Sequence, residues 1–91
     1  MNKARRTQIN KELIAIAEAI DAMRTALENL QGFATEEQEC FDNMPEGLQA
    51  SENGQRIEEI AQALESANSS LESAIDDVES AVEEISEAVT Q

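Results

Sequence analysis

The stretch FDNMPEGLQASENG, residues 41–54, separates two long helical patterns in this chain. Met44 stands before Pro45, and a residue before proline is pushed out of the α-helical region, so a helix that reaches this point ends here. Ser51 is suited to cap a second helix, and the negative charge of Glu52 suits the positive end of that helix. The stretch therefore predicts two long helices joined by a short turn.

The boundaries follow from the same signals. We expect one domain, residues 1–91, with a first helix over about 3–42, a turn over about 43–51 and a second helix over about 52–90. Gly32 either ends the first helix or is tolerated inside it. We favour a continuous helix, because the apolar spacing nearly continues beyond this glycine.

The turn itself carries a motif with two possible roles. These residues either terminate and cap helices or are recognised directly by a partner. They are Asp42, Met44, Pro45 and Glu46. Leu48 is the one leucine in the connection, and we expect it to pack back onto the helix ends. Gly54 is expected to be a mild flaw in the first turn of the second helix, because glycine has low helix propensity.

Apolar residues recur every three or four positions in both predicted helices, which is typical of helices that pack lengthwise. In the first helix these residues are Ile9, Leu13, Ile16, Ile20, Met23, Leu27 and Leu30. In the second they are Ile57, Ile60, Leu64, Ala67, Leu71, Ile75, Val78, Val82, Ile85 and Val89. Two consecutive steps of four around Leu71 form a stutter, which relaxes a left-handed supercoil.

The predicted fold is all-α, an antiparallel two-helix hairpin resembling a coiled coil. Two helices of this size bury little apolar surface, so we expect a homo-oligomer, most simply a dimer that forms a four-helix bundle. The residues expected in the oligomer seam are Ile16, Ile20, Leu27, Leu64, Leu71, Ile75 and Val78.

The charge of the chain is uneven. The formal net charge is −14, yet residues 1–24 hold five basic against three acidic residues, a balance of +2. The other residues hold one basic against seventeen acidic residues, a balance of −16. An antiparallel hairpin brings two oppositely charged groups together at its open end, Lys3, Arg5 and Arg6 in one helix and Glu83, Glu84 and Glu87 in the other.

A surface this acidic predicts a basic protein partner and no direct binding of nucleic acid, whose phosphates are bound by lysine and arginine. The candidate partner-binding residues are the acids of the second helix, Glu72, Asp76, Asp77, Glu79, Glu83 and Glu84. Carboxylates on a rigid helix can imitate a nucleic-acid backbone. They can equally form a solvated face that keeps the protein in solution.

The residue inventory argues against an enzyme. The chain has no histidine and one cysteine, so we expect no catalytic residue, metal site or cofactor. Glu36 and Glu39 match half of the magnesium motif of helical pyrophosphohydrolases, but no later Glu-x-x-Asp completes it. No apolar run approaches the roughly 18 residues that span a bilayer, so no membrane association is expected.

Three further side chains have structural interpretations. Cys40 is expected to be a small apolar residue on the packed face beside Phe41 rather than a reactive thiol, because nearby acids disfavour the thiolate. Phe33 and Phe41 are the only aromatic residues, and either close the end of the hairpin or anchor a partner.

The turn at residues 41–54 has an aromatic residue and Asp, then Met-Pro-Glu, Leu-Gln, Ser-Glu and Gly, and it resembles that of small acidic helical proteins encoded by bacteriophages, prophages and related mobile elements. The resemblance covers about 14 residues, and the members of this group are largely uncharacterised. It implies a setting in the cytoplasm of a bacterial host cell. It also favours an inhibitor, since phages encode small acidic proteins that block host nucleases and defence systems.

Two hypotheses of different classes follow. The first is a non-enzymatic inhibitor that docks on a basic surface of a host nucleic-acid-handling or defence complex, in the manner of an anti-CRISPR, anti-restriction or DNA-mimic protein. The alternative is a structural coiled-coil adaptor or scaffold without an inhibitory role. A protein that binds a small ligand between protomers is a weaker third option, because the chain has few aromatic and cationic side chains.

Overall fold

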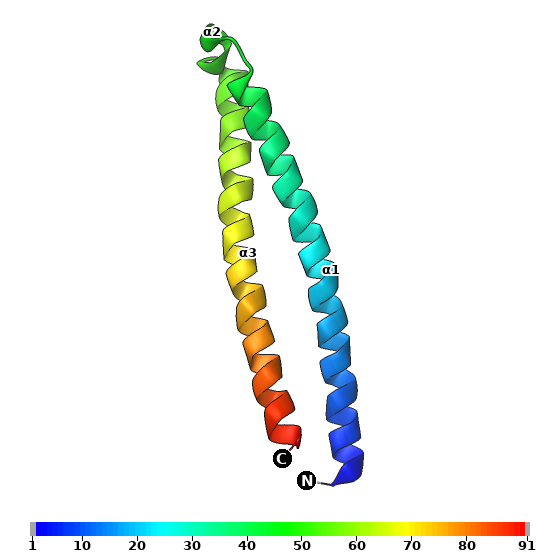
Figure 1. Cartoon of the computed structure of the whole chain (residues 1–91). Helices are drawn as coiled ribbons and strands as arrows, with labels where there is room; N and C mark the ends of the chain where they lie inside the picture. The colour runs from blue at the N-terminus through cyan, green and yellow to red at the C-terminus, as the bar shows by residue number, and fades with distance from the viewer. Residues whose placement is uncertain (1, 91) are drawn as a thin grey trace.

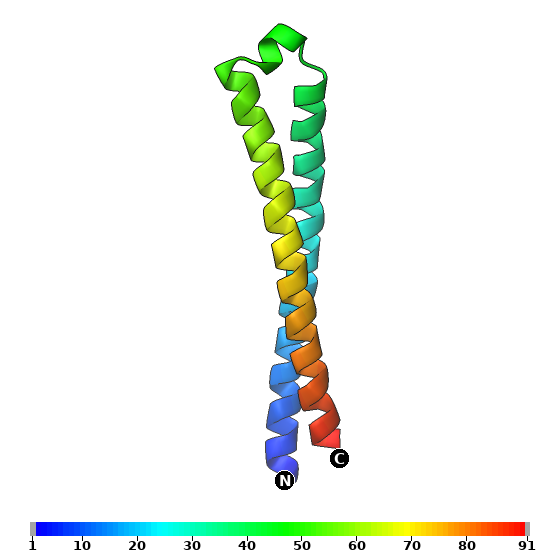
Figure 2. The ribbon, with the colours of Figure 1, turned by 90° about the vertical axis from the view of Figure 1, so that its left-hand side faces the viewer.

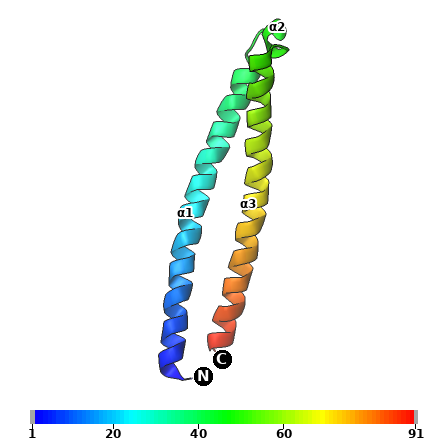
Figure 3. The same cartoon turned by 180° about the vertical axis from the view of Figure 1, so that it is seen from behind.

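The computed structural model describes residues 2–90, which form three helices: α1 (Lys3–Asp42), α2 (Glu46–Gln49) and α3 (Glu52–Thr90). α1 and α3 run antiparallel along each other, with α2 at the end where they are joined (Figure 1). The view from behind shows the same side-by-side pair (Figure 3), and the two helices cross at a small angle when seen from the side (Figure 2). No strand occurs within residues 2–90, so the predicted all-α class is confirmed.

The helix pair is long and thin, with extents of 69 × 15 × 15 Å. Its radius of gyration is 20.3 Å, whereas a compact domain of this length has a radius of about 12 Å. The interior is therefore a single thin layer between two helices. Its buried apolar residues are Ile20, Ala34, Ala61, Ile75 and Val89.

α1 is continuous through Gly32, as the apolar spacing indicates. An alanine-like Cβ built at Gly32 would meet no atom within 4 Å, so this glycine serves no close approach. One glycine costs a helix only about 1 kcal/mol, which a helix of 40 residues tolerates. At the N-terminal end, the Asn2 side chain accepts a hydrogen bond from the Arg5 amide (2.7 Å) and caps the helix.

α1 ends at Asp42, and the connection is more regular than the predicted turn. Pro45 starts the one-turn helix α2, and its carbonyl accepts hydrogen bonds from the amides of Leu48 (2.8 Å) and Gln49 (3.0 Å). The Gln49 side chain donates to the Phe41 carbonyl (3.0 Å) and so ties α2 to the end of α1. Leu48 does not pack back as expected, since it is 53% exposed.

Ser51 caps α3 as predicted, because its hydroxyl oxygen accepts a hydrogen bond from the Gly54 amide (3.2 Å). The interpretation of Gly54 as a flaw is wrong. Gly54 is buried, and a Cβ there would lie 2.7 Å from the Gln49 carbonyl oxygen and closer still to that of Leu48. Both obstacles are backbone atoms, so α2 can lie across the start of α3 only where α3 has no side chain.

The predicted apolar residues do recur at helical spacing, but only some of them face the opposite helix. The residues that face the opposite helix recur every seven positions, and we call these two rows the inner columns. They are Leu13, Ile20, Leu27, Ala34 and Phe41 in α1, and Gly54, Ala61, Asn68, Ile75, Val82 and Val89 in α3. Every member is buried or half-buried. A repeat of seven runs through α3 without a break, so the stutter inferred around Leu71 does not describe its inner face.

Two further apolar rows lie beside each inner column. The middle columns are Ile9, Ile16, Met23 and Leu30 in α1, and Ile57, Leu64, Leu71, Val78 and Ile85 in α3. The outer columns are Ala19, Ala26, Phe33 and Cys40 in α1, and Ile60, Ala67, Ala74, Ala81 and Ala88 in α3. The middle columns are half-buried or exposed, and every outer-column residue is exposed. The apolar stripe of each helix is thus three columns wide, and the helix pair uses one edge of it.

Candidate functional site

The six carboxylates predicted to bind a partner are all exposed. They do not form one row. Glu72 and Glu79 lie beside the inner column on the side that approaches α1, whereas Asp77 and Glu84 lie across α3 at the far edge of the apolar stripe, by helical spacing. The six residues therefore cover the whole arc of α3 that the three apolar columns leave free.

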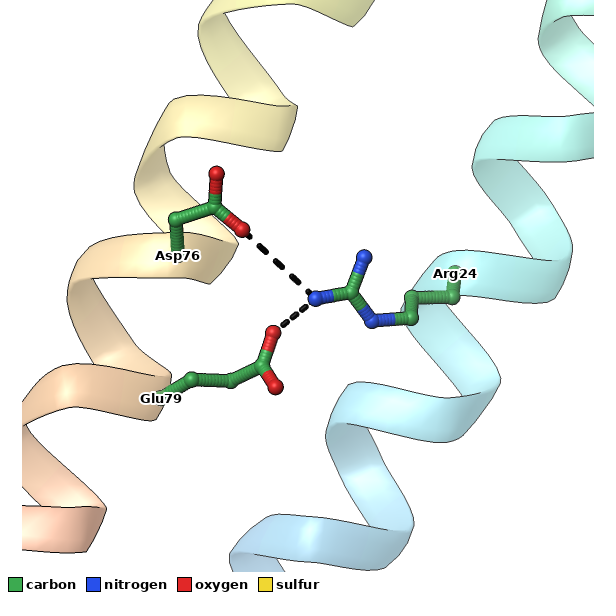
Figure 4. A network of polar contacts seen from close by, with 3 residues as sticks. All are labelled: Arg24, Asp76 and Glu79. Carbon is green, nitrogen blue, oxygen red and sulfur yellow. Dashed lines mark hydrogen bonds and ion pairs between the residues drawn. The ribbon is translucent and has the colours of Figure 1, made fainter.

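Two of these carboxylates bind a cation of the same chain. The Arg24 guanidinium forms ion pairs with Asp76, at an N–O distance of 3.6 Å, and with Glu79 (Figure 4). The three side chains are 42%, 74% and 47% exposed respectively, so water weakens the pairing and it contributes less than about 1 kcal/mol. The main effect of the pairing is to connect α1 to α3, since Arg24 and Glu79 are 55 positions apart in the sequence.

The ion pairs expected at the open end of the helix pair are not formed. Among residues 2–90, Arg24 is the only basic residue with an acidic partner within 4 Å. Lys3, Arg5 and Arg6 are exposed, as are the three glutamates predicted to meet them. Long exposed side chains lose conformational freedom when they pair in water, which cancels much of the attraction.

A polar groove runs along the side of the helix pair that contains Arg24. Its lining comes from both long helices: Arg24, Leu27, Glu28, Gln31, Asn68, Ser69 and Glu72. A second, smaller hollow nearer α2 is lined by residues that include Gln38 and Glu65. Because α1 and α3 are antiparallel, residues displaced to the same rotational side of both inner columns meet on one side of the pair. The middle and outer columns of both helices therefore meet on the opposite side.

Asn68 is the one polar residue among the buried inner-column positions, and it is not among the residues predicted from the sequence. Its amide nitrogen donates to the Leu27 carbonyl (3.5 Å) and to Gln31 Oε1 (3.3 Å). Its carbonyl oxygen is buried without a hydrogen-bond partner among the described residues. Asn68 lies seven positions from both Ala61 and Ile75, and this spacing places it in the inner column. A search for apolar residues alone passes over it, because Asn68 is polar.

The middle and outer columns together form an exposed surface that we call the apolar face. Large side chains exposed on it are Ile16, Met23, Phe33, Ile60, Leu71, Val78 and Ile85. Four of the residues predicted for the oligomer seam lie on this face: Ile16, Leu71 and Val78 are exposed and Leu64 is half-buried. The other three lie in the inner columns: Ile20 and Ile75 are buried between α1 and α3, and Leu27 is half-buried.

The prediction that Cys40 packs within the hairpin is wrong, since Cys40 is exposed. It lies in the outer column of α1, which projects about 100° away from the inner column. Phe33 lies in the same column and is 54% exposed, so it does not help to close the helix pair. Phe41 is half-buried at the end of α1.

The turn motif combines structural and accessible residues. Pro45 separates α1 from α2, and Met44 is half-buried. The Asp42 carboxylate accepts a hydrogen bond from the side-chain amide of Gln38 (2.9 Å). Glu46 is exposed in the first turn of α2. Helix termination is therefore observed for Pro45, and Glu46 is free to contact a partner.

No three acidic or cysteine side chains within residues 2–90 are grouped closely enough to hold a metal ion. None of the helices in this part of the chain has a stretch long and apolar enough to cross a membrane. Two surfaces remain as candidates, the carboxylates of α3 and the apolar face.

No protein-family model, no curated protein and no solved structure matches the chain.

Proposed function

We propose that the protein is a non-enzymatic binding protein that dimerises into a four-helix bundle and docks the carboxylates of α3 on a basic surface of a partner protein. The observation that carries the proposal is the separation of charge from apolar surface. The middle and outer columns of α3 hold no charged residue between Ile57 and Ala88, although 29% of the chain is charged. The acidic residues of α3 are left on the arc that faces solvent.

The electrostatic field of α3 supports a basic partner. α3 holds eleven acidic residues and one arginine, a balance of −10, while α1 holds eight acidic and five basic residues, a balance of −3. A field of one sign over a long surface attracts oppositely charged proteins and speeds their encounter. The same field repels the phosphates of free nucleic acid.

The spacing of the carboxylates supports a partner that handles nucleic acid. Seven acidic residues lie between Glu72 and Glu87, and this part of α3 is about 22 Å long at about 1.5 Å per residue. The resulting density is one negative charge per about 3 Å, similar to the one charge per about 3.4 Å along a single DNA strand. A groove that accepts a DNA strand is therefore matched in charge by the acidic arc of α3.

The turn motif at residues 44–54 adds the biological setting, since it resembles that of small acidic proteins from mobile elements. We propose that the partner is a nucleic-acid-handling or defence complex in the cytoplasm of a bacterial host. Binding would occupy its nucleic-acid groove and inhibit it.

The test compares two triple variants of equal charge. In one, Asp77, Glu83 and Glu84 of α3 are changed to Asn, Gln and Gln; in the control, Glu18, Asp21 and Glu28 of α1 are changed to Gln, Asn and Gln. Neither variant alters the ion pairs of Arg24. Tagged protein is used to capture partners from host lysate at about 150 mM NaCl, and duplex DNA is then added as a competitor.

We expect native protein and the α1 variant to retain a basic nucleic-acid-binding protein that duplex DNA releases, and the α3 variant to lose it. Equal retention by the two variants contradicts the proposal, as does the absence of any basic partner. The exposed apolar face specifically favours the alternative, an assembly adaptor. An adaptor forms larger oligomers by light scattering and keeps its partners when the α3 carboxylates are neutralised.

A further inference from the structure

The apolar face extends along the whole helix pair on the side opposite the polar groove. In its columns, charged residues occur only toward the ends of α1, as Arg5, Glu12 and Glu37. Four alanines of α3 follow one another at seven-residue intervals in the outer column, and such small side chains allow another helix to approach closely. A continuous exposed apolar surface of this size marks an interaction site.

The width of the stripe indicates how many helices it contacts. Ala74 in the outer column and Ile75 in the inner column are consecutive, so they project about 100° apart, and Leu71 and Val78 project between them. A helix in a square four-helix bundle has its two neighbours in directions about 90° apart, with the bundle axis between them. In α3, the inner column contacts the first neighbour, α1. The outer column is thus directed toward a second neighbour, and the middle column toward a central axis.

We infer that a second copy of this chain covers the apolar face, with the middle columns of four helices filling the centre of a bundle and the outer columns packing between the two copies. The inference rests on the proposed dimer and specifies the surface through which it forms. The other member of such a bundle must present a pair of helices with the same three-column stripe over the same length, and the chain itself does so. The acidic arcs of the two copies then remain on the outside.

The area of the face fits a stable dimer. A surface 69 Å long and 15 Å wide covers about 1,000 Å² on each copy, or about 2,000 Å² in total, which lies within the range of stable protein interfaces. The isolated chain exposes 6767 Å², whereas a compact monomer of this mass exposes about 5,200 Å². Dimerisation through the apolar face removes much of this excess.

A matched pair of substitutions tests the surface. Ile85→Glu places a charge in the middle column of α3, and Ile14→Glu places the same charge at an exposed isoleucine outside all three columns of α1. Both isoleucines are exposed in the isolated chain, at 45% and 62%, so neither change empties its interior. We expect Ile85→Glu to raise the dimer dissociation constant by about 100-fold or more, because it buries an unpaired charge among apolar side chains, and Ile14→Glu to leave it within about 3-fold. Sedimentation equilibrium measures both constants.

Cys40 supplies an independent measurement, because it lies in the outer column and is exposed in the isolated chain. We expect its reaction with a maleimide to be at least about 10-fold slower in the dimer than in the Ile85→Glu protein. Circular dichroism confirms that each variant is helical. Similar reaction rates in the native dimer and in Ile85→Glu overturn the inference.

The outcomes separate this inference from the proposed function. A native chain that is monomeric at all concentrations overturns the dimer and the inference together, but leaves the binding of a basic partner by α3 to its own test. A native dimer that persists in Ile85→Glu and dissociates in Ile14→Glu overturns the inference alone, since the copies then meet through another surface.

Discussion

Gly54 shows how a single residue decides the geometry of the turn. Its Cα lies under the carbonyl groups of Leu48 and Gln49, so α2 can cross the start of α3 only because there is no side chain at this position. Ser51 accepts a hydrogen bond from the Gly54 amide and donates one to the Leu48 carbonyl, so it links α2 to the start of α3. The turn motif therefore depends on a glycine for space, not for an unusual backbone conformation.

Changing Gly54 to alanine is expected to lower the free energy of unfolding by about 1–3 kcal/mol, because the new methyl group is forced against backbone atoms. Gly32→Ala is the control, since a Cβ at Gly32 meets nothing within 4 Å. That change is expected to stabilise α1 by about 0.5–1 kcal/mol through higher helix propensity. Urea unfolding followed by circular dichroism measures both. If the two changes have the same sign, the proposed role of Gly54 is incorrect.

Asn68 places a polar group in the row of residues between the helices. Its nitrogen reaches two oxygen atoms of α1, while its own oxygen is buried without a partner among residues 2–90. A buried unpaired polar atom costs stability. A single buried asparagine can nevertheless select one register, because other registers leave both of its ends unpaired.

Asn68→Leu is expected to raise the free energy of unfolding by about 1–2 kcal/mol, because it removes the unpaired oxygen and adds apolar contact. The register of α1 against α3 should become less uniform. The midpoint of urea unfolding measures the first effect, and disulfide trapping between cysteines engineered in α1 and α3 measures the second. A less stable Asn68→Leu protein indicates that the oxygen has a partner in solution.

At the scale of helices, the contact between α1 and α3 consists of two inner columns with a polar groove along one side. The inner columns include three small residues in the half toward α2, namely Ala34, Ala61 and Gly54. The ion pairs of Arg24 connect the two helices across the groove. Packing keeps the helices together, and the polar contacts select how they are aligned.

Arg24→Gln is expected to lower the free energy of unfolding by less than about 1 kcal/mol, because both ion pairs are exposed to water. Arg56→Gln removes the same charge from an exposed arginine that has no ion pair among the described residues. The difference between the two variants isolates the pairing from the change in net charge. We expect this difference to disappear in about 1 M NaCl, where the screening length is about 3 Å. A difference that persists there means that the pairs are less exposed than the structure shows.

At the scale of the whole molecule, repulsion between negative charges opposes the limited stabilisation that a thin interior provides. The chain carries a net charge of −14 on a body only 15 Å across, so its carboxylates repel one another at short range. One ion-paired arginine offsets little of this repulsion. Dissolved salt, which screens this repulsion, is therefore expected to stabilise the helix pair.

Raising NaCl from about 0.05 M to about 0.5 M is expected to raise the melting temperature by about 5 °C or more, which corresponds to roughly 1 kcal/mol for a domain of this size. Thermal unfolding at fixed protein concentration gives the measurement, because a dimer melts at a temperature that depends on concentration. A melting temperature that falls with salt shows that attraction between charges outweighs their repulsion.

The helix boundaries and the all-α class were predicted from the sequence because they depend on neighbouring residues. The ring of Pro45 prevents α1 from continuing, and the Ser51 cap acts over three positions. The spacing of apolar residues also revealed that both helices pack lengthwise. These features need no information about residues far away in the chain.

The tertiary structure alone decided which edge of each three-column stripe faces the other helix. It buries Asn68 rather than Leu71, pairs Arg24 with α3, and makes Gly54 necessary for the turn. The physical reason is that rotation of a helix about its axis depends on contacts between distant residues, such as Leu27 and Asn68, which are 41 positions apart. A repeat of three and four residues specifies a stripe but does not say which neighbour each part of that stripe contacts.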